Sequence, residues 1–146
     1  MSITTRAATD DDLPALLALY AELHPDDPRP ADDAVHAAWR AITAQAGRTV
    51  LVAEDGGGVL GTVDCTVLPN LTRGTRPFML VENVVVAAAA RRRGVGSVLF
   101  DAVLALAERH GCYKVQLLSR ATRDAAHQFY EAQGFAPVAQ GFRRYL

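Results

Sequence analysis

The feature that most constrains this fold is a segment in which an apolar strand leads into an arginine- and glycine-rich turn and then into a helix. Residues 78–86 are strongly apolar and are interrupted only by Glu82 and Asn83. After them come four alanines, three arginines and the sequence Gly-Val-Gly-Ser, and apolar residues then recur at helical spacing as far as Gly111. A buried strand that leads directly into a helix indicates an α/β fold.

The flanking sequence predicts the remaining elements. Pro14 belongs in the first turn of an N-terminal helix because proline has no N–H to donate, so the N-cap should be Asp10 or Asp11. The glycines at 56–58 supply the positive φ angles of a tight hairpin. We therefore expect an α/β (α+β) fold with a mixed, mostly antiparallel central sheet flanked by helices on both faces. Further strands are expected at residues 3–7, 49–53, 59–68 and 115–118 and in two short pieces around Gly141, and further helices at residues 32–46 and 124–133.

Length, charge and cysteine spacing narrow the class of protein. A chain of 146 residues that is 50% hydrophobic predicts a single compact domain over residues 1–146. Its 15 basic and 16 acidic residues lack the cationic excess of nucleic-acid-binding proteins. No apolar run approaches the roughly 18 residues of a membrane span and no signal core begins the chain, so we expect a cytoplasmic protein without a membrane partner. Cys65 and Cys112 lack metal-ligand spacing, so no metal site is expected.

The turn at 91–97 predicts an anion site. The first N–H groups of a helix have no intrahelical partner, and the positive end of the helix dipole lies beside them. Gly94 and Gly96 remove the β-carbons that would hold a phosphate away, while the arginines add charge. A Walker loop is excluded because no lysine precedes Ser97, and a Rossmann fingerprint is excluded because Leu99 stands where its third glycine belongs. The segment is therefore suited to a diphosphate.

The pattern Arg91-x-x-Gly94-x-Gly96 resembles the phosphate-binding motif of the GNAT acetyltransferases. The sequences at residues 82–86 and 111–114 are similar to glucosamine-6-phosphate N-acetyltransferases, and those at 126–130 and 142–146 to aminoalkylphosphonate N-acetyltransferases. The resemblance implies a GNAT fold and transfer of an acetyl group from acetyl-CoA to the primary amine of a small acceptor. A catalytically silent acyl-CoA-binding sensor and a nucleotide-binding regulator are the alternatives.

The resemblance also implies roles for individual residues. Tyr130 would donate a proton to the departing thiolate. Glu82 is the candidate base, acting through a water molecule, because it is the only acid in an otherwise apolar strand and its burial there would be costly without a function or a partner. The alternatives are a core aromatic at Tyr130 and a solvent-facing acid at Glu82. The expected coenzyme-binding residues are Asn83, Val84, Val85, Val86, Arg91, Arg92, Arg93, Gly94, Val95, Gly96, Ser97, Phe129 and Tyr130.

Arginines outside this turn suggest an anionic acceptor. Guanidinium groups bind phosphate or carboxylate bidentately, so we expect a phosphate, phosphonate or carboxylate on the amine substrate. Solvated surface charges are the alternative reading. The resemblance further implies a possible homodimer through the C-terminal strands. The arginines in question are Arg73, Arg76, Arg120, Arg123 and Arg143.

Overall fold

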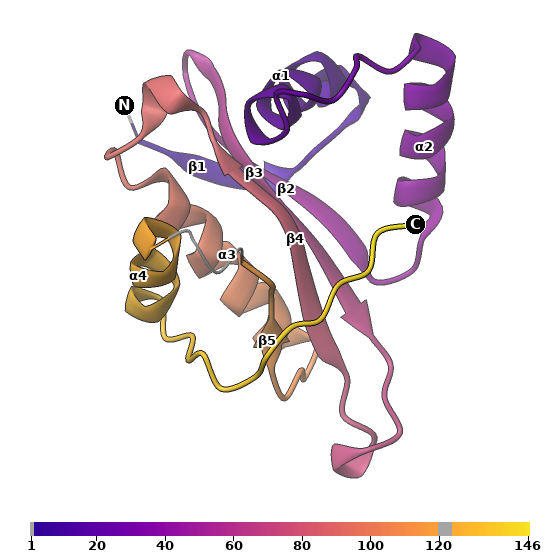
Figure 1. The fold of residues 1–146 in the computed structure, drawn as a ribbon, viewed down its shortest axis with the longest axis vertical. Helices are drawn as coiled ribbons and strands as arrows, with labels where there is room; N and C mark the ends of the chain where they lie inside the picture. The colour runs from indigo at the N-terminus through magenta and orange to yellow at the C-terminus, as the bar shows by residue number, and fades with distance from the viewer. Residues whose placement is uncertain (1, 120–123) are drawn as a thin grey trace. The chain divides into compact units, whose positions relative to one another are not determined.

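The computed structural model describes residues 2–119 and 124–146, which divide into two compact units after Gln116. The larger unit contains a five-stranded sheet in the order β1-β2-β3-β4-β5 (Figure 1). Neighbouring strands are antiparallel except β4 and β5, which are parallel, and this confirms the predicted mixed, mostly antiparallel sheet. Its elements are β1 (Thr4–Ala7), the 3-10 helix η1 (Asp10–Asp12), α1 (Leu13–Leu23), α2 (Asp32–Ala44), β2 (Arg48–Asp55), β3 (Gly58–Leu68), η2 (Arg73–Thr75), β4 (Phe78–Val86), η3 (Ala88–Ala90), α3 (Val95–Arg109) and β5 (Val115–Gln116).

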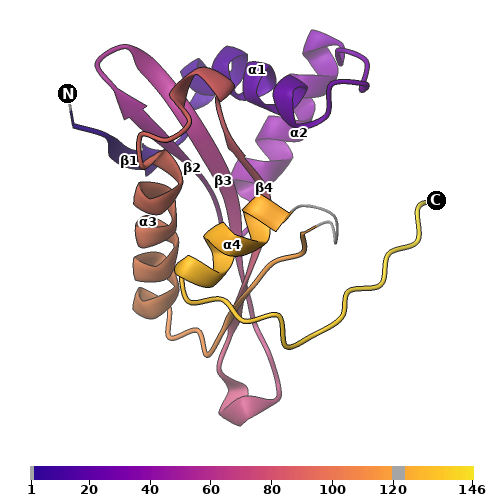
Figure 2. The same cartoon turned by 60° about the vertical axis from the view of Figure 1, so that its left-hand side comes forward.

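Helices cover both faces of this sheet, with α1 and α2 on one side and α3 on the other (Figure 2). Side chains alternate between the two faces along a strand, so each strand contributes to two cores. Val50 and Val52 of β2 are buried in one cluster with Leu13 and Leu16 of α1 and with Trp39 of α2. One apolar face of α1 thus packs on the sheet.

The opposite core depends on a close approach between α3 and β3 at Gly61. A β-carbon on Gly61 would lie 3.0 Å from the carbonyl oxygen of Val85, 3.1 Å from Cγ1 of Val95 and 3.2 Å from Cδ1 of Leu99. These distances leave little room for any side chain. Gly61 therefore lets the start of α3 rest directly on the sheet, a role that its isolated position in the sequence did not indicate.

A β-bulge interrupts the ladder between β3 and β4. The register shifts between Thr62 and Asp64, so Val63 alone lies opposite both Asn83 and Val84. Asn83 has a φ of 51°, in the left-handed region that residues other than glycine rarely adopt. Bulges bend the strand that contains them and leave backbone groups unpaired, and they are common beside active sites.

The smaller unit, which starts at Leu117, contains α4 (Asp124–Ala132). Gly134 follows that helix with a φ of 90°, the left-handed conformation that glycine commonly adopts after the end of a helix. The two short strands predicted around Gly141 are wrong, because residues 135–146 form no strand in the described chain. A strand needs a hydrogen-bonding neighbour, and apolar side chains of this segment remain exposed instead. They are Val138, Phe142, Tyr145 and Leu146.

The N-terminal helix begins later than the predicted N-cap at Asp10 or Asp11. Those residues form η1, and α1 starts at Leu13. The reason is Asp12, whose Oδ2 accepts the Thr9 N–H at 2.7 Å and pairs with Nη1 of Arg6 at 2.7 Å. Arg6 also donates from Nε to Oε1 of Glu54 at 2.9 Å, so this ion-pair group links β1, β2 and η1.

We expect the Asp12 ion pair to make unfolding sensitive to acid. Hydrogen bonds from Arg6, then from the Thr9 backbone, lower the pKa of Asp12 to about 2. Because the folded-state pKa lies below the unfolded value, this stabilisation is complete above roughly pH 4 and is lost as the pH falls toward 2. The side chain of Arg6 is 39% exposed. With solvent screening allowed for, the effect should be on the order of 1 kcal/mol.

Urea unfolding at pH 6 and pH 3 measures this contribution. Asp12→Asn should reduce the stability difference between the two pH values, whereas Asp11→Asn, at an exposed neighbour, should leave it unaltered. An equal acid sensitivity in Asp12→Asn and the unmodified chain would contradict the assignment.

Candidate functional site

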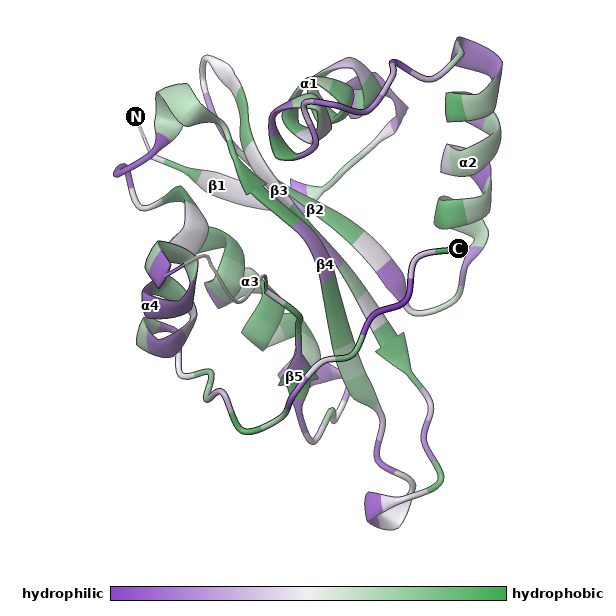
Figure 3. Cartoon of the chain, in the orientation of Figure 1, coloured by the Kyte–Doolittle hydropathy of each residue, from purple (hydrophilic) through white to green (hydrophobic). Residues whose placement is uncertain are grey.

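The bulge exposes the polar centre of β4. Figure 3 shows a hydrophilic band across this otherwise hydrophobic strand. Glu82 and Asn83 are exposed there, so Glu82 is an acid on a solvent-facing position rather than a buried one. In the ladder Glu82 lies opposite Asp64, which is buried.

The outer edge of β4 is open beside the bulge. β5 pairs with β4 only at Met79 and Leu80, so in the described sheet no strand extends the parallel ladder to Val84 or Val86. Unpaired backbone groups on a strand edge can bind an extended ligand as an additional strand would. Val84, Val85 and Val86, which are among the predicted coenzyme-binding residues, therefore lie where the edge of the described sheet has no neighbouring strand.

The chain between β4 and α3, called the cradle below, contains the residues predicted to bind an anion. Arg92 has a φ of 64° and Gly94 a φ of 80°, and left-handed residues in such turns direct backbone N–H groups into one concavity. The N–H of Val98 donates to the carbonyl oxygen of Gly94 at 3.1 Å, so the N–H groups of Val95 and Gly96 precede the first helical hydrogen bond. A β-carbon on Gly94 would meet no protein atom within 4 Å. The cradle thus has open space for an anion.

The three arginines of the cradle differ in their surroundings. Arg91 and Arg92 are exposed, and neither forms an ion pair with another described residue. Nη2 of Arg93 instead donates to Oδ2 of Asp55 at 2.7 Å. The Arg93 guanidinium, and then the N–H of Gly57, hold the pKa of Asp55 below its usual range. Arg93 is therefore already paired with an ionised carboxylate.

A buried ion pair lies on the α1 face of the sheet next to the bulge. Asp64 accepts from Nε of Arg48 at 3.0 Å through Oδ1 and from Nη2 at 2.6 Å through Oδ2. For Tyr20 of α1, burial, followed by the charge of Asp64, raises the pKa of the phenol. Arg48 and Asp64 are far apart in sequence and belong to no motif, so sequence reasoning missed this cluster.

The structure places the other predicted residues as follows. Arg73 lies in η2, with its guanidinium 5.5 Å from the Tyr113 ring centroid, and Nη2 of Arg76 donates to the Cys112 carbonyl oxygen at 3.3 Å. Both precede β4 and so lie at the opposite end of this strand from the cradle. Arg143 belongs to the smaller unit, where its guanidinium is 5.8 Å from the Tyr145 ring centroid. Arg120 and Arg123 lie outside the described residues.

Tyr130 and Phe129 lie on α4 of the smaller unit and are half-buried. The ring of Tyr130 packs edge-on against Phe129 at 5.5 Å and Phe135 at 6.1 Å between centroids. These contacts agree with an aromatic cluster and leave the proton-donor role of Tyr130 a prediction.

Neither cysteine is suited to nucleophilic chemistry. Burial, and then the charge of Asp64, raises the pKa of Cys65 to about 12, and burial also raises the pKa of Cys112. Within residues 2–119 and 124–146, His, Cys, Asp and Glu side chains form no cluster of three that could hold a metal ion. None of the helices in this part of the chain is both long enough and apolar enough to span a membrane.

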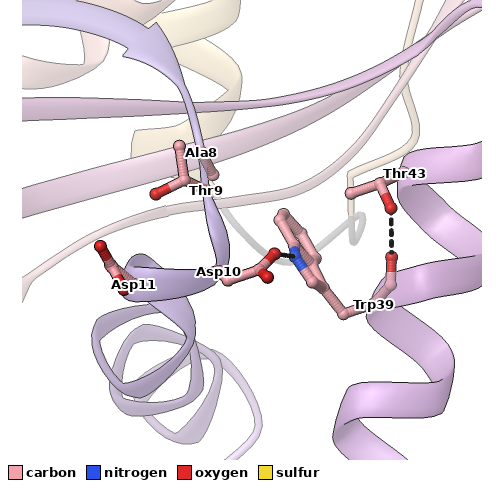
Figure 4. A pocket seen from close by; sticks show the side chains of 6 residues that line it. All are labelled: Ala8, Thr9, Asp10, Asp11, Trp39 and Thr43. Carbon is pink, nitrogen blue, oxygen red and sulfur yellow. Dashed lines mark hydrogen bonds between the residues drawn. The ribbon is translucent and has the colours of Figure 1, made fainter.

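A surface pocket of about 490 Å³ lies between η1 and α2, away from the bulge and the cradle (Figure 4). Its Trp39 donates from Nε1 to Oδ1 of Asp10 at 2.7 Å. This bond connects α2 to η1, and the pocket contains none of the predicted site residues. Its lining is Ala8, Thr9, Asp10, Asp11, Trp39 and Thr43.

We expect the buried pair to be sensitive to loss of one partner. Arg48→Met leaves a carboxylate that is 4% exposed without its cation and should destabilise the fold by about 3 kcal/mol. Arg48→Met combined with Asp64→Leu should recover most of that loss, because an apolar pair replaces a buried ion pair at little cost. Urea unfolding tests this, with Arg40→Met on the exposed side of α2 as the matched control. If Arg48→Met were as stable as the unmodified chain, Arg48 would not be needed to compensate the Asp64 carboxylate.

Comparisons with known proteins agree on one family. The model of the Acetyltransferase (GNAT) family matches residues 13–135. A putative acetyltransferase from Agrobacterium tumefaciens str. C58 is 39% identical, with 100% of both chains covered and a TM-score of 0.94. A protein described as a transcriptional regulator from Bacillus halodurans C-125 is 27% identical, covers 99% of this chain and 100% of its own, and has a TM-score of 0.89.

A curated relative extends this result. The glucosamine 6-phosphate N-acetyltransferase of Trypanosoma brucei brucei is 34% identical over 79 residues, which are 54% of this chain and 52% of that protein. The match therefore spans about half the length of the curated relative. The predicted fold and family are both confirmed, and this chain belongs to the GNAT family of acetyltransferases.

Proposed function

We propose that this protein transfers an acetyl group from acetyl-CoA to the primary amine of a small acceptor. The observation that supports this most directly is that the bulged strand β4, whose outer edge β5 pairs only at Met79 and Leu80, leads within a few residues into the cradle before α3. An extended pantetheine arm fits a free strand edge, and a diphosphate fits helix N–H groups beside two exposed arginines. Both parts of acetyl-CoA thus have a matching surface.

In this proposal the cradle binds the diphosphate through Arg91, Arg92 and the first turn of α3. The backbone of Val84 and Val86 pairs with the pantetheine amides. An N–H at Asn83 or Val84 polarises the thioester carbonyl, because the bulge removes these groups from the regular ladder. Holding donor and acceptor together supplies much of the rate enhancement that such a transfer needs.

The remaining chemistry consists of two proton transfers. The amine nitrogen attacks the thioester carbonyl carbon, the carbon–sulfur bond breaks, and the sulfur leaves with its electron pair. Glu82 accepts a proton from the amine through water, and Tyr130 donates one to the thiolate. The exposure of Glu82 supports a water-mediated path rather than direct contact.

The acceptor is proposed to contain a phosphate, phosphonate or carboxylate group. The curated match supports this, since that relative is named for a phosphorylated amino sugar. Exposed arginines at Arg73, Arg76 and Arg143 are proposed to bind such a group, although Arg73 and Arg76 precede β4 and lie at the other end of that strand from the cradle. A homodimer and a cytoplasmic location stay predictions from the sequence.

A catalytically silent acyl-CoA sensor is the second candidate. It is favoured by the 27% identity to a chain described as a transcriptional regulator. The sensor would bind the coenzyme through the same cradle without turnover. Activity measurements therefore separate the two proposals, whereas binding measurements do not.

Gly96→Ala should separate coenzyme binding from stability. A helical β-carbon tilts toward the helix N-terminus and would enter the anion space, so we expect the Kd for acetyl-CoA to rise at least about tenfold. The melting temperature without ligand should stay equal or rise, because alanine favours helix by roughly 1 kcal/mol over glycine. Ala105→Gly, an exposed change later in α3, should lower stability without altering affinity. Titration calorimetry with unaltered affinity in Gly96→Ala would place the diphosphate elsewhere.

A free-thiol release assay with paired amines tests the reaction. We expect kcat/KM to be at least about tenfold higher for an amino-sugar phosphate or an aminoalkylphosphonate than for the same amine without its anionic group. Equal rates for neutral, polycationic and phosphorylated amines, with an unaltered KM in Arg123→Ala, would exclude the anionic acceptor.

The Tyr130→Phe variant tests the proton donor. It should bind the coenzyme with unaltered affinity, and its kcat should be about a hundredfold lower. No thiol release with any amine would favour the sensor.

A further inference from the structure

Two carboxylates from other elements hold the ends of the cradle. The N–H of Ala88 donates to Oε1 of Glu22, on α1, at 2.8 Å. At the other end Arg93 donates to Asp55, at the end of β2, at 2.7 Å. The cradle is therefore fastened both to α1 and to the β2–β3 hairpin.

Asp55 is itself fixed by the hairpin turn. Its Oδ1 accepts the N–H of Gly57 at 2.7 Å while Oδ2 binds Arg93, and its side chain is only 12% exposed. A carboxylate with both oxygens occupied and little exposure has few alternative positions. It can therefore hold the Arg93 guanidinium at a defined place on the rim of the cradle.

The chain between these two contacts is strained. Arg92 adopts a left-handed φ of 64°, which a residue other than glycine occupies only when its surroundings require it. Arg91 and Arg92 remain exposed and form no ion pair with another described residue. A loop that is held at both ends can keep such a conformation before the ligand arrives, and preorganisation of this kind increases affinity.

We propose that Glu22 and Asp55 are positioning residues for the diphosphate of the coenzyme. Glu22 fixes the backbone at Ala88, and Asp55 fixes the Arg93 guanidinium. Arg93 then supports the loop without binding phosphate, a role that we call a strut. The charge that meets the diphosphate then comes from Arg91 and Arg92. This inference rests on the proposed function and assigns a binding role to two acids that would otherwise be expected to repel an anion.

A competing interpretation predicts the opposite change in coenzyme affinity when Asp55 is removed. If Asp55 merely competed with the diphosphate for Arg93, its removal would free a guanidinium and tighten binding. If Arg93 is a strut, removal of either partner loosens the cradle and weakens binding. Replacing both Asp55 and Arg93 should weaken binding no more than replacing either one, because the two residues act as a unit.

Titration calorimetry with coenzyme A on the full chain tests this. Asp55→Asn, Arg93→Gln and the double variant should each raise the Kd by a similar factor of about ten. Arg93→Lys keeps the ion pair, so its Kd should stay close to that of the unmodified chain. This variant provides the comparison if Asp55→Asn fails to fold. Glu22→Ala should weaken binding, whereas Glu22→Gln keeps an acceptor for the Ala88 N–H and should retain affinity.

Salt dependence distinguishes a strut from a ligand. Loss of an arginine that contacts phosphate makes binding less sensitive to ionic strength, so Arg91→Gln should flatten the dependence of Kd on salt. Arg93→Gln should leave that dependence unaltered. Tighter or unaltered binding in Asp55→Asn, or an equal flattening in Arg93→Gln and Arg91→Gln, would overturn the inference while leaving the proposed function intact. Absence of coenzyme binding by the unmodified chain would refute both.

Discussion

The insertion of one extra residue in β4 opposite Val63 interrupts the regular ladder of this sheet. The bulge removes Asn83 and Val84 from the ladder and leaves Asn83 exposed on an otherwise apolar strand. Just beyond it the same strand leads to α3, and Gly61 lets the start of that helix rest on β3. The edge of β4 and the N-terminus of α3 therefore both depend on how β4 and α3 pack against β3.

The charged groups around this region are positioned by distant parts of the chain. Arg48 neutralises Asp64, the cross-strand partner of Glu82, so the exposed acid does not lie opposite an uncompensated buried charge. Asp55 similarly pairs with Arg93 at the cradle. In both places an arginine–carboxylate pair across elements determines which charges remain for a ligand. Local sequence alone does not determine the electrostatics of the site.

The sequence predicts local features well and pairings between strands poorly. The apolar run of β4 and the glycines at the start of α3 are patterns of residues adjacent in sequence, and such patterns predict individual elements. The predicted strand Phe78–Val86 is accordingly confirmed residue for residue. The bulge at Asn83 depends on the register with β3, and the Arg48–Asp64 pair depends on β2 beside β3. No local pattern contains that information. The strands around Gly141 were wrong for the same reason, since a strand requires a partner.

A crystal structure of the protein with acetyl-CoA is the most direct test of the central claim that one strand and one helix terminus form the coenzyme site. The account predicts diphosphate oxygens within hydrogen-bond distance of the N–H groups of Val95 and Gly96, and pantetheine amides paired with the backbone of Val84 and Val86. A coenzyme bound elsewhere, for example in the pocket beside Trp39, with the edge of β4 and the cradle empty, would contradict it.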